Sequence, residues 1–396
     1  MRIVVAGAGI GGLTAALALN RAGFEVEVLE QAPALGEVGA GIQISPNAVK
    51  VLWALGLADP LERVAVRPLA LEGHDFKTGE LMYTVPLGEA VVAEHGAPYY
   101  HIYRPDLLQV LSDAAQAEGL AIRFDARVAD VSQDNTGATV RLENGDVVAG
   151  DLLVGADGIN SRVKQALFGP HPPRFTGNVA FRGTVPVDRL PDGLIERKGY
   201  NWMGPHHHFV HYFVNGGRLV NCVGVCEQPD WRIESWVHPG DLDEYKAEFA
   251  GWHDTIQTLI GAMSHCFKWA LFDRDPLDRW TVGRATLLGD SAHPMLPFLA
   301  QGACMAIEDG YALTRCLQAH DDPLAALADY ETRRRPRTAQ MQLGARARAT
   351  QLHAADPELV RQRNEAVAAD PDYMAKVMKA AYAYDAIADL GAIESL

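Results

Sequence analysis

The sequence predicts an α/β fold in which two domains are interleaved along the chain and the C-terminus is helical. Three observations lead to this prediction. The chain opens with a short apolar strand that runs into a glycine-rich turn and a helix. A central stretch, 176–275, carries five of the seven tryptophans and alternating patterns such as FVHYFV, which are typical of antiparallel strands. After residue 280 the sequence again shows a buried strand, a glycine-bearing loop and a helix, as at the start of the chain.

The first thirty residues predict one βαβ unit. Residues 2–6 read as a buried strand, and the helix that follows ends near Gly23, a residue type that favours helix C-termini. A second strand, 25–29, leads into Glu30. This order is the beginning of a parallel, Rossmann-like sheet.

The remaining chain divides by its patterns. Helices are expected after Asn47 and over 103–119, and strands over 121–131, 138–143 and 147–154. We expect four segments: 1–175 as the first part of a cofactor domain, with 68–100 contributing to the second domain; 176–275 as a β-rich substrate domain; 276–350 as the cofactor domain resumed; and 351–396 as a helical C-terminal segment.

The composition restricts the function. The chain has 396 residues, 48% of them hydrophobic and 21% charged, which is enough for a large core. A net charge of −15 disfavours nucleic acid and anionic membranes as partners. Five cysteines without CxxC spacing, and no apolar span or leader, indicate free thiols in a cytoplasmic protein. Cys222 and Cys226, the closest pair, read as core residues, and we expect no metal site.

The first chemical motif is the GxGxxG formed by Gly7, Gly9 and Gly12 between the strand and the helix. Such a loop allows a tight turn, a close approach of the backbone to a pyrophosphate, and close packing of helix on strand. Glu30 is placed to accept hydrogen bonds from a ribose diol, and its carboxylate disfavours a 2′-phosphate. The loop predicts a dinucleotide site, and both NAD and FAD remain open.

Two further motifs favour FAD. Residues 152–162 read LLVGADGINSR, and residues 287–297 read LLGDSAHPMLP, followed by AQGACMAIEDG. With the glycine loop, and in this order over about residues 1–350, they resemble the flavoprotein aromatic hydroxylases, the FAD monooxygenases typified by hydroxybenzoate and salicylate hydroxylases. The resemblance implies a p-hydroxybenzoate hydroxylase-like fold, in which the Rossmann-like domain binds FAD.

The resemblance also implies roles for individual residues. Asp290 would bond the ribitol hydroxyls of FAD, and Arg104 its phosphates. Asp157 and Arg162 would lie where the flavin and nicotinamide sites meet. The helix beginning near Gly302 would point its N-terminus at the flavin pyrimidine, where negative charge grows on reduction. The other residues implied at the cofactor are Gln31, Val128 and Ala303.

The candidate substrate residues lie on the strand HHHFVHYFV. Alternation places His207, Phe209, His211 and Phe213 on one face and His206, His208 and Tyr212 on the other, and one face should line the substrate cavity. We expect His211 to be the base or to orient the substrate, because enzymes similar to 3-hydroxybenzoate hydroxylase place a histidine on the corresponding strand. A metal site is the less favoured interpretation, because no cysteine or carboxylate lies near these histidines in sequence.

Three more residues complete the catalytic candidates. Gln301 matches a pocket-facing glutamine of the same subgroup. His293 could act in catalysis or cap the loop beside the flavin. Tyr212 could donate a hydroxyl or be a core tyrosine.

The resemblance implies that NADH or NADPH reduces FAD, and that a flavin C4a-hydroperoxide made with O2 hydroxylates a small phenolic acid of the salicylate or 3-hydroxybenzoate class. The alternative is a 6-hydroxynicotinate-type enzyme, although that group carries a histidine near the position of Asn47. A same-fold reductase or epoxidase, or a non-catalytic flavin-binding protein, is disfavoured by the polar segment 350–396 and by the histidine-lined wall. A monomer or a homodimer is expected.

Overall fold

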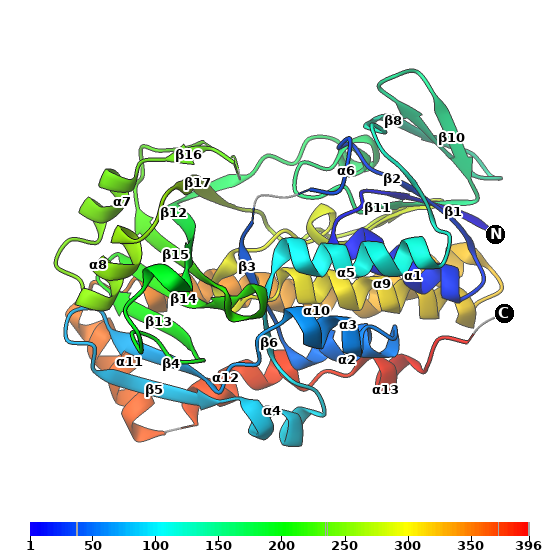
Figure 1. Ribbon diagram of the computed structural model, residues 1–396. Coiled ribbons are helices and arrows are strands. Elements are labelled where there is room, and N and C mark those ends of the chain that lie inside the picture. The colour runs from blue at the N-terminus through cyan, green and yellow to red at the C-terminus, as the bar shows by residue number, and fades with distance from the viewer. Residues whose placement is uncertain (37–38, 234, 236, 371, 395–396) are drawn as a thin grey trace.

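The computed structural model describes residues 1–36, 39–233, 235, 237–370 and 372–394, and it is built around two sheets (Figure 1). The first has the strand order β18-β19-β11-β1-β2-β7. Its strands are β18 (Thr281–Val282), β19 (Ala285–Leu287), β11 (Leu152–Gly155), β1 (Arg2–Ala6), β2 (Glu25–Leu29) and β7 (Ala121–Arg123). The second sheet has eight strands, and the mixed α/β fold is as predicted.

The first sheet is parallel from β19 through β7, because β1 pairs in parallel with both β11 and β2, β11 with β19, and β2 with β7. Ile3–Ala6 of β1 is buried on both faces, as such a central strand requires. Helices α1 (Ile10–Arg21), α5 (Arg104–Ala117) and α9 (Gly302–Ala319) pack together over this sheet (Figure 1). This is the cofactor domain that the opening βαβ unit predicts.

The second sheet has the order β16-β17-β12-β15-β14-β13-β4-β5. Its strands are β16 (Pro239–Gly240), β17 (Cys266–Asp273), β12 (Arg174–Pro186), β15 (Leu219–Glu227), β14 (His207–Val214), β13 (Gly199–Gly204), β4 (Ala70–Asp75) and β5 (Leu81–Pro86). Helices α7 (Leu242–Glu248) and α8 (Asp254–Gly261) cover the face that is turned away from the cofactor domain (Figure 1). We call this face the back and the opposite one the front.

The C-terminal part is helical, as expected. Helix α10 (Pro323–Leu352) packs against α9, and α11 (Pro357–Ala369) and α12 (Tyr373–Tyr382) lie beside β5 at the edge of the second sheet (Figure 1). The remaining elements are β3 (Gly41–Ile44), α2 (Pro46–Ala54), α3 (Ala58–Val64), α4 (Gly88–His95), β6 (Tyr100–Tyr103), β8 (Val128–Gln133), β9 (Ala138–Leu142), β10 (Val147–Gly150), α6 (Arg162–Phe168) and α13 (Ala386–Leu390). Over the described ranges, no helix has the length and apolar character needed to cross a membrane.

Two predicted strands prove to be two strands each. The stretch 121–131 contains β7 of the six-stranded sheet and β8 of a separate three-stranded sheet, β10-β9-β8. Asp125 has a φ of 52° between them, which turns the chain out of the first sheet. The stretch 147–154 likewise divides into β10 and β11. Apolar alternation continues across both turns, so the pattern alone does not reveal the breaks.

Candidate active site

The glycine loop follows β1 and begins α1. Gly7 has a φ of 107°, and a Cβ there would lie 2.3 Å from the carbonyl oxygen of Ala156. A Cβ on Gly12 would lie 1.9 Å from the oxygen of Gly7. At Gly9, by contrast, a Cβ would meet no atom of the described chain within 4 Å. Two glycines are therefore required by protein packing, whereas Gly9 leaves an open approach to the helix N-terminus, which suits a pyrophosphate.

Glu30 directly follows β2 and points back at this loop. Its carboxylate accepts hydrogen bonds from the backbone N–H of Ala8 at 2.8 Å and of Ala32 at 2.9 Å. These bonds fix its orientation and leave further lone pairs for a ribose diol. Gln31 is exposed beside it, and Val128 is buried at the start of β8.

Asp290 and Arg104 share one recess between the first sheet and α5. Asp290 sits in the turn after β19, and its side chain is open to solvent, yet the protein around the recess desolvates it and raises its pKa. Burial lowers the pKa of Arg104 to about 10, and Asp290 opposes that change. An anion and a cation held apart in this way fit the hydroxyl-rich and phosphate-rich parts of FAD.

The N-terminus of α9 meets the same recess. A Cβ on Gly302, the first residue of α9, would lie 4.0 Å from Oδ1 of Asp290. Ala303 follows in the first turn, and no acidic residue lies there to neutralise the helix dipole. The glycine cradle, Asp290, Arg104 and this terminus together fit a bound FAD.

Asp157 connects two of the sequence motifs through hydrogen bonds. Its carboxylate accepts hydrogen bonds from the backbone N–H of Arg162 at 2.6 Å and from the hydroxyl of Ser291 at 3.2 Å. Asp157 therefore accepts backbone N–H groups of the first turn of α6 and connects the motif at 152–162 to the motif at 287–297. The Arg162 side chain is exposed and contacts Gln165.

Gln301 belongs to a buried polar chain behind the start of α9. Its amide donates to the Ser45 hydroxyl at 2.9 Å and accepts from Asn47 at 3.2 Å. Asn47 also donates to Glu308 at 2.6 Å. These bonds use one donor and one acceptor of the Gln301 amide and hold the N-terminus of α9 against α2.

His293 is held by a buried ion-pair network. Its Nε2 lies 2.5 Å from Oδ2 of Asp309, whose Oδ1 accepts from Nε of Arg334 at 2.7 Å. Burial alone would raise the pKa of Asp309, but His293 and Arg334 lower it below the usual value. His293 is only 1% exposed, which favours the interpretation that it braces the loop beside the flavin.

The strand register identifies the residues on each face of the second sheet. One row across β15, β14 and β13 contains Cys222, His211 and Tyr200, and it lies on the back. His211 is fully buried, stacks on Tyr200 with ring centroids 4.5 Å apart, and accepts a hydrogen bond from Trp202 Nε1 at 2.9 Å. Burial lowers the pKa of His211 to about 3. This placement corrects the expectation that His211 faces the substrate: it lies in the core beneath α7 and α8.

The front of the sheet carries His208 and Tyr212 instead. Tyr212 packs against His101 of β6, with ring centroids 4.3 Å apart and the rings tilted by 33°, and it lies against Gly41 of β3. His208 contacts Phe298, four residues before α9, and its Nδ1 lies 2.6 Å from Nε2 of His353. Burial holds the pKa of His208 well below its usual value and raises that of Tyr212. His206, expected on this face, lies in the turn before β14 and pairs with Glu227.

Arg182 on β12 completes the front face, because it shares a row with Val223 and Val210. Its guanidinium lies 4.9 Å from the centre of the Trp269 ring. Burial, together with Arg104, lowers its pKa to about 10. Sequence reasoning missed both Arg182 and His208. Alternation already grouped His208 with Tyr212, but it could not tell which face is turned inward.

A cavity of about 230 Å³ borders the front face where Met203, the cross-strand neighbour of His208, meets α10 and α11. Arg348 and Arg363 line it together with Tyr83. Burial and the neighbouring Arg348 lower the pKa of Arg363. Two guanidiniums that repel each other in one cavity favour a bound anion.

Comparison with known proteins agrees with this site. Residues 1–344 match the FAD binding domain family. The chain is 41% identical over 367 residues to a 3-amino-4-hydroxybenzoate 2-monooxygenase of Streptomyces platensis, covering 92% of each chain. It is 39% identical to a 6-hydroxynicotinate 3-monooxygenase of Bordetella bronchiseptica, covering 86% of this chain and 89% of the relative.

Among solved structures, HpxO of Klebsiella pneumoniae, complexed with FAD and uric acid, superposes with a TM-score of 0.86. The two chains are 28% identical, and the match covers 97% of this chain and 96% of the other. The family match, the relatives and the FAD cradle agree with one another. The chain belongs to the FAD-dependent aromatic hydroxylases, a family of flavoprotein monooxygenases.

Proposed function

We propose that this enzyme uses NADH or NADPH and O2 to hydroxylate a small aromatic acid that carries a phenolic hydroxyl. The observation that carries the proposal is the composition of the front face. There a tyrosine, a neutral histidine and an arginine lie together, opposite the start of α9 and the recess of Asp290 and Arg104. Bound FAD would pass electrons from the nicotinamide to O2 and deliver the activated oxygen, and the residues around it bind, orient and move protons.

His208 and Tyr212 are the residues that we propose for proton transfer. Nδ1 of His208 is engaged with His353, so Nε2 is the nitrogen left for a substrate hydroxyl. A base that takes the phenolic proton raises the electron density of the ring, which favours attack on an electrophilic oxygen. His353 has its other nitrogen 4.0 Å from Oε1 of the half-exposed Glu227. The proton therefore has a path from His208 through His353 toward the surface.

A carboxylate substrate needs local positive potential, because the whole chain carries a net charge of −15. Arg182 provides it on the front face, and Arg348 and Arg363 provide it in the bordering cavity. The N-terminus of α9 adds its dipole. The long-range repulsion of an anion is thus offset only where the ring has to bind.

The heterocyclic alternative stays within the same chemistry. A 6-hydroxynicotinate-type substrate also has a ring carboxylate and an acidic hydroxyl, and one relative is named for it. Asn47 is bonded to Gln301 and Glu308 behind the start of α9. Asn47 thus stands near the position where we expect a histidine in a 6-hydroxynicotinate-type enzyme. We therefore propose the benzoate class first.

The test is a screen of substrate-stimulated NADH and NADPH oxidation by the FAD-loaded protein. The panel contains 3-hydroxybenzoate, salicylate, 3-amino-4-hydroxybenzoate and 6-hydroxynicotinate, with benzoate as the control that lacks a hydroxyl. Products are identified by mass spectrometry with labelled O2. At least one phenolic acid should stimulate oxidation and gain one labelled oxygen. A protein that binds FAD but forms no oxygenated product with any member contradicts the proposed substrate class.

A further inference from the structure

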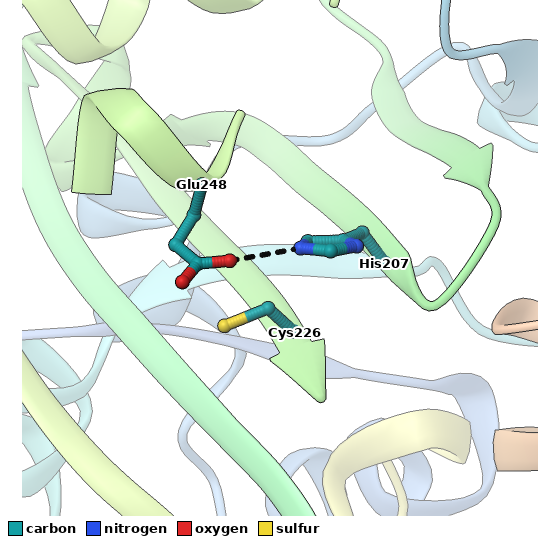
Figure 2. A group of neighbouring side chains, drawn as sticks. All are labelled: His207, Cys226 and Glu248. Carbon is teal, nitrogen blue, oxygen red and sulfur yellow. Dashed lines mark hydrogen bonds and ion pairs between the residues drawn. The ribbon is translucent and has the colours of Figure 1, made fainter. Parts of the chain in front are cut away.

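A second cluster of reactive side chains lies on the back of the second sheet (Figure 2). His207 at the start of β14 and Cys226 near the end of β15 are direct cross-strand partners. Glu248, the last residue of α7, reaches down to them, and Figure 2 shows all three side chains converging. One ligand atom from each lies within 4.8 Å of the other two. The expectation of no metal site rested on the distance between these residues along the sequence. The fold brings them together.

The hydrogen bonds of His207 direct its Nε2 at the carboxylate of Glu248. Nδ1 lies 3.0 Å from the carbonyl oxygen of Pro205, which can only accept, so Nδ1 carries a proton. Nε2 lies 3.1 Å from Oε2 of Glu248, which as a carboxylate also only accepts. Either a second proton or a metal ion must therefore lie between the ring and the carboxylate. A histidine whose Nδ1 donates to a backbone carbonyl is the usual form of an Nε2 metal ligand.

The ligand types and spacing fit zinc. Imidazole nitrogen, thiolate sulfur and carboxylate oxygen are its preferred donors, and its bond lengths put the ligand atoms of a tetrahedral site about 3.3–3.7 Å apart. The nitrogen and oxygen here are already close to that separation. Because all three atoms lie within 4.8 Å, the sulfur needs to move by about 1 Å or less, within the reach of a rotamer adjustment.

The surroundings support a dication with two anionic ligands. The other oxygen of Glu248 accepts from Gln228 Nε2 at 2.6 Å, which orients the carboxylate. The nearby cation Lys268 is engaged elsewhere, because it pairs with Glu244 at 2.6 Å.

We propose that His207, Cys226 and Glu248 bind one Zn²⁺ ion, with water in the fourth position. The Cys226 side chain is fully buried, whereas those of His207 and Glu248 are 19% and 28% exposed, so the ion enters from the solvent side. The site joins β14, β15 and α7 on the face away from the flavin. The ion therefore stabilises the substrate domain and takes no part in hydroxylation.

Zinc retention is the first measurement. The tag-free holoenzyme is stripped with a chelator, incubated with zinc and desalted, and its metal content is measured by mass spectrometry. About one zinc per chain is expected. Cys226→Ser and Glu248→Gln should each weaken zinc binding at least about tenfold, because each removes an anionic ligand. Glu244→Gln, on the same helix but paired with Lys268, should retain zinc as the parent does.

Cobalt identifies the ligands directly. Bound Co²⁺ should give tetrahedral d–d absorption on the red side of the flavin bands, and Cys226→Ser should remove most of that intensity. Added zinc should raise the melting temperature of the parent and of Glu244→Gln. The proposal is overturned if the parent retains no zinc above its Cys226→Ser variant, or if Glu248→Gln binds as tightly as the parent.

Discussion

His208 and His211 are separated by three positions on β14, and this odd spacing places their rings on opposite faces of the sheet. One ring meets Phe298 and His353 on the front, while the other is enclosed by Tyr200 and Trp202 in the back core. Two chemically identical side chains on one strand therefore have different access to a substrate.

This difference gives a paired test. His208→Gln should bind FAD and still oxidise NADH, but hydroxylation should fall by roughly 10² as the general base is lost, with hydrogen peroxide released instead. The matched variant His211→Gln should keep the parent's ratio of product to NADH consumed, even if it is less stable. Coupling is measured from product, peroxide and NADH together. Loss of coupling in His211→Gln alone would restore His211 as the substrate residue.

The roles of Gly9 and Gly12 in the glycine loop can be distinguished by a similar pair of variants. Gly9→Ala should leave the melting temperature of the FAD-free protein within about 2 °C of the parent, because its Cβ meets no described atom, yet FAD affinity should fall. Gly12→Ala should instead destabilise the FAD-free protein by about 1–3 kcal/mol, because its Cβ overlaps the oxygen of Gly7. Denaturant unfolding and FAD titration measure the two effects independently. Equal stability losses in the two variants would contradict this division.

At the scale of single elements, α9 is positioned by buried charge. Glu308 and Asp309 are both fully buried and pair with Arg334 of α10, and Glu308 also pairs with Arg337. The same two residues connect α9 to Asn47 and to His293. The N-terminal end of α9 is therefore fixed by contacts made one to two turns further along the helix.

Removing Arg334 should show how much the buried ion pairs of α9 contribute to stability. Arg334→Met removes the cation that two buried carboxylates share, so that Glu308 keeps only Arg337 as an ion-pair partner and Asp309 only His293, and it should lower the free energy of unfolding by about 3–5 kcal/mol. The adjacent Arg333→Met removes only an exposed pair with Asp329, so about 0.5 kcal/mol or less is expected. Urea unfolding of the FAD-loaded variants provides the comparison. A similar loss in both variants would show that the buried network does not hold α9.

Elements also differ in how far the sequence predicts them. The cofactor loop lies within six consecutive residues. One turn and the start of one helix make all of its contacts with the cofactor, so the sequence alone is sufficient to find the loop. The front face is assembled from β12, β13, β14 and β15, which are brought together by register. Alternation separates His208 from His211 but contains no information on which face the cofactor domain covers. Arg182 belongs to no motif, so only the fold places it beside Tyr212.

At the scale of the whole molecule, four buried histidines make stability depend on pH. Burial lowers the pKa of His101 and His211 to about 3 and of His353 to about 4, and it holds that of His208 well below the usual value. In the unfolded chain these groups titrate near about 6.5. Below that pH the unfolded state takes up protons that the folded state does not, so stability is complete above about pH 6.5 and is lost as the pH falls toward 4.

Each such histidine contributes up to about 1.4 kcal/mol per pH unit in this window. The free energy of unfolding at saturating FAD should therefore fall steeply between pH 6.5 and pH 5. His211→Phe should make this slope shallower, whereas His265→Gln, which changes an exposed ring, should not. A stability that is flat between pH 7 and pH 5 would mean that these rings are protonated in the fold.

Helix α10 runs for 30 residues without interruption, about 45 Å, and it contacts both halves of the molecule. Near its first turns Glu331 accepts the backbone N–H groups of Trp280 and Thr281 in the cofactor domain, and directly after its end His353 bonds His208 in the substrate domain. The helix therefore acts as a rigid strut, and hinging the two halves apart would break bonds at one end or the other. The aromatic substrate must therefore enter through small movements of loops and side chains. The overall shape of the protein should change very little during turnover.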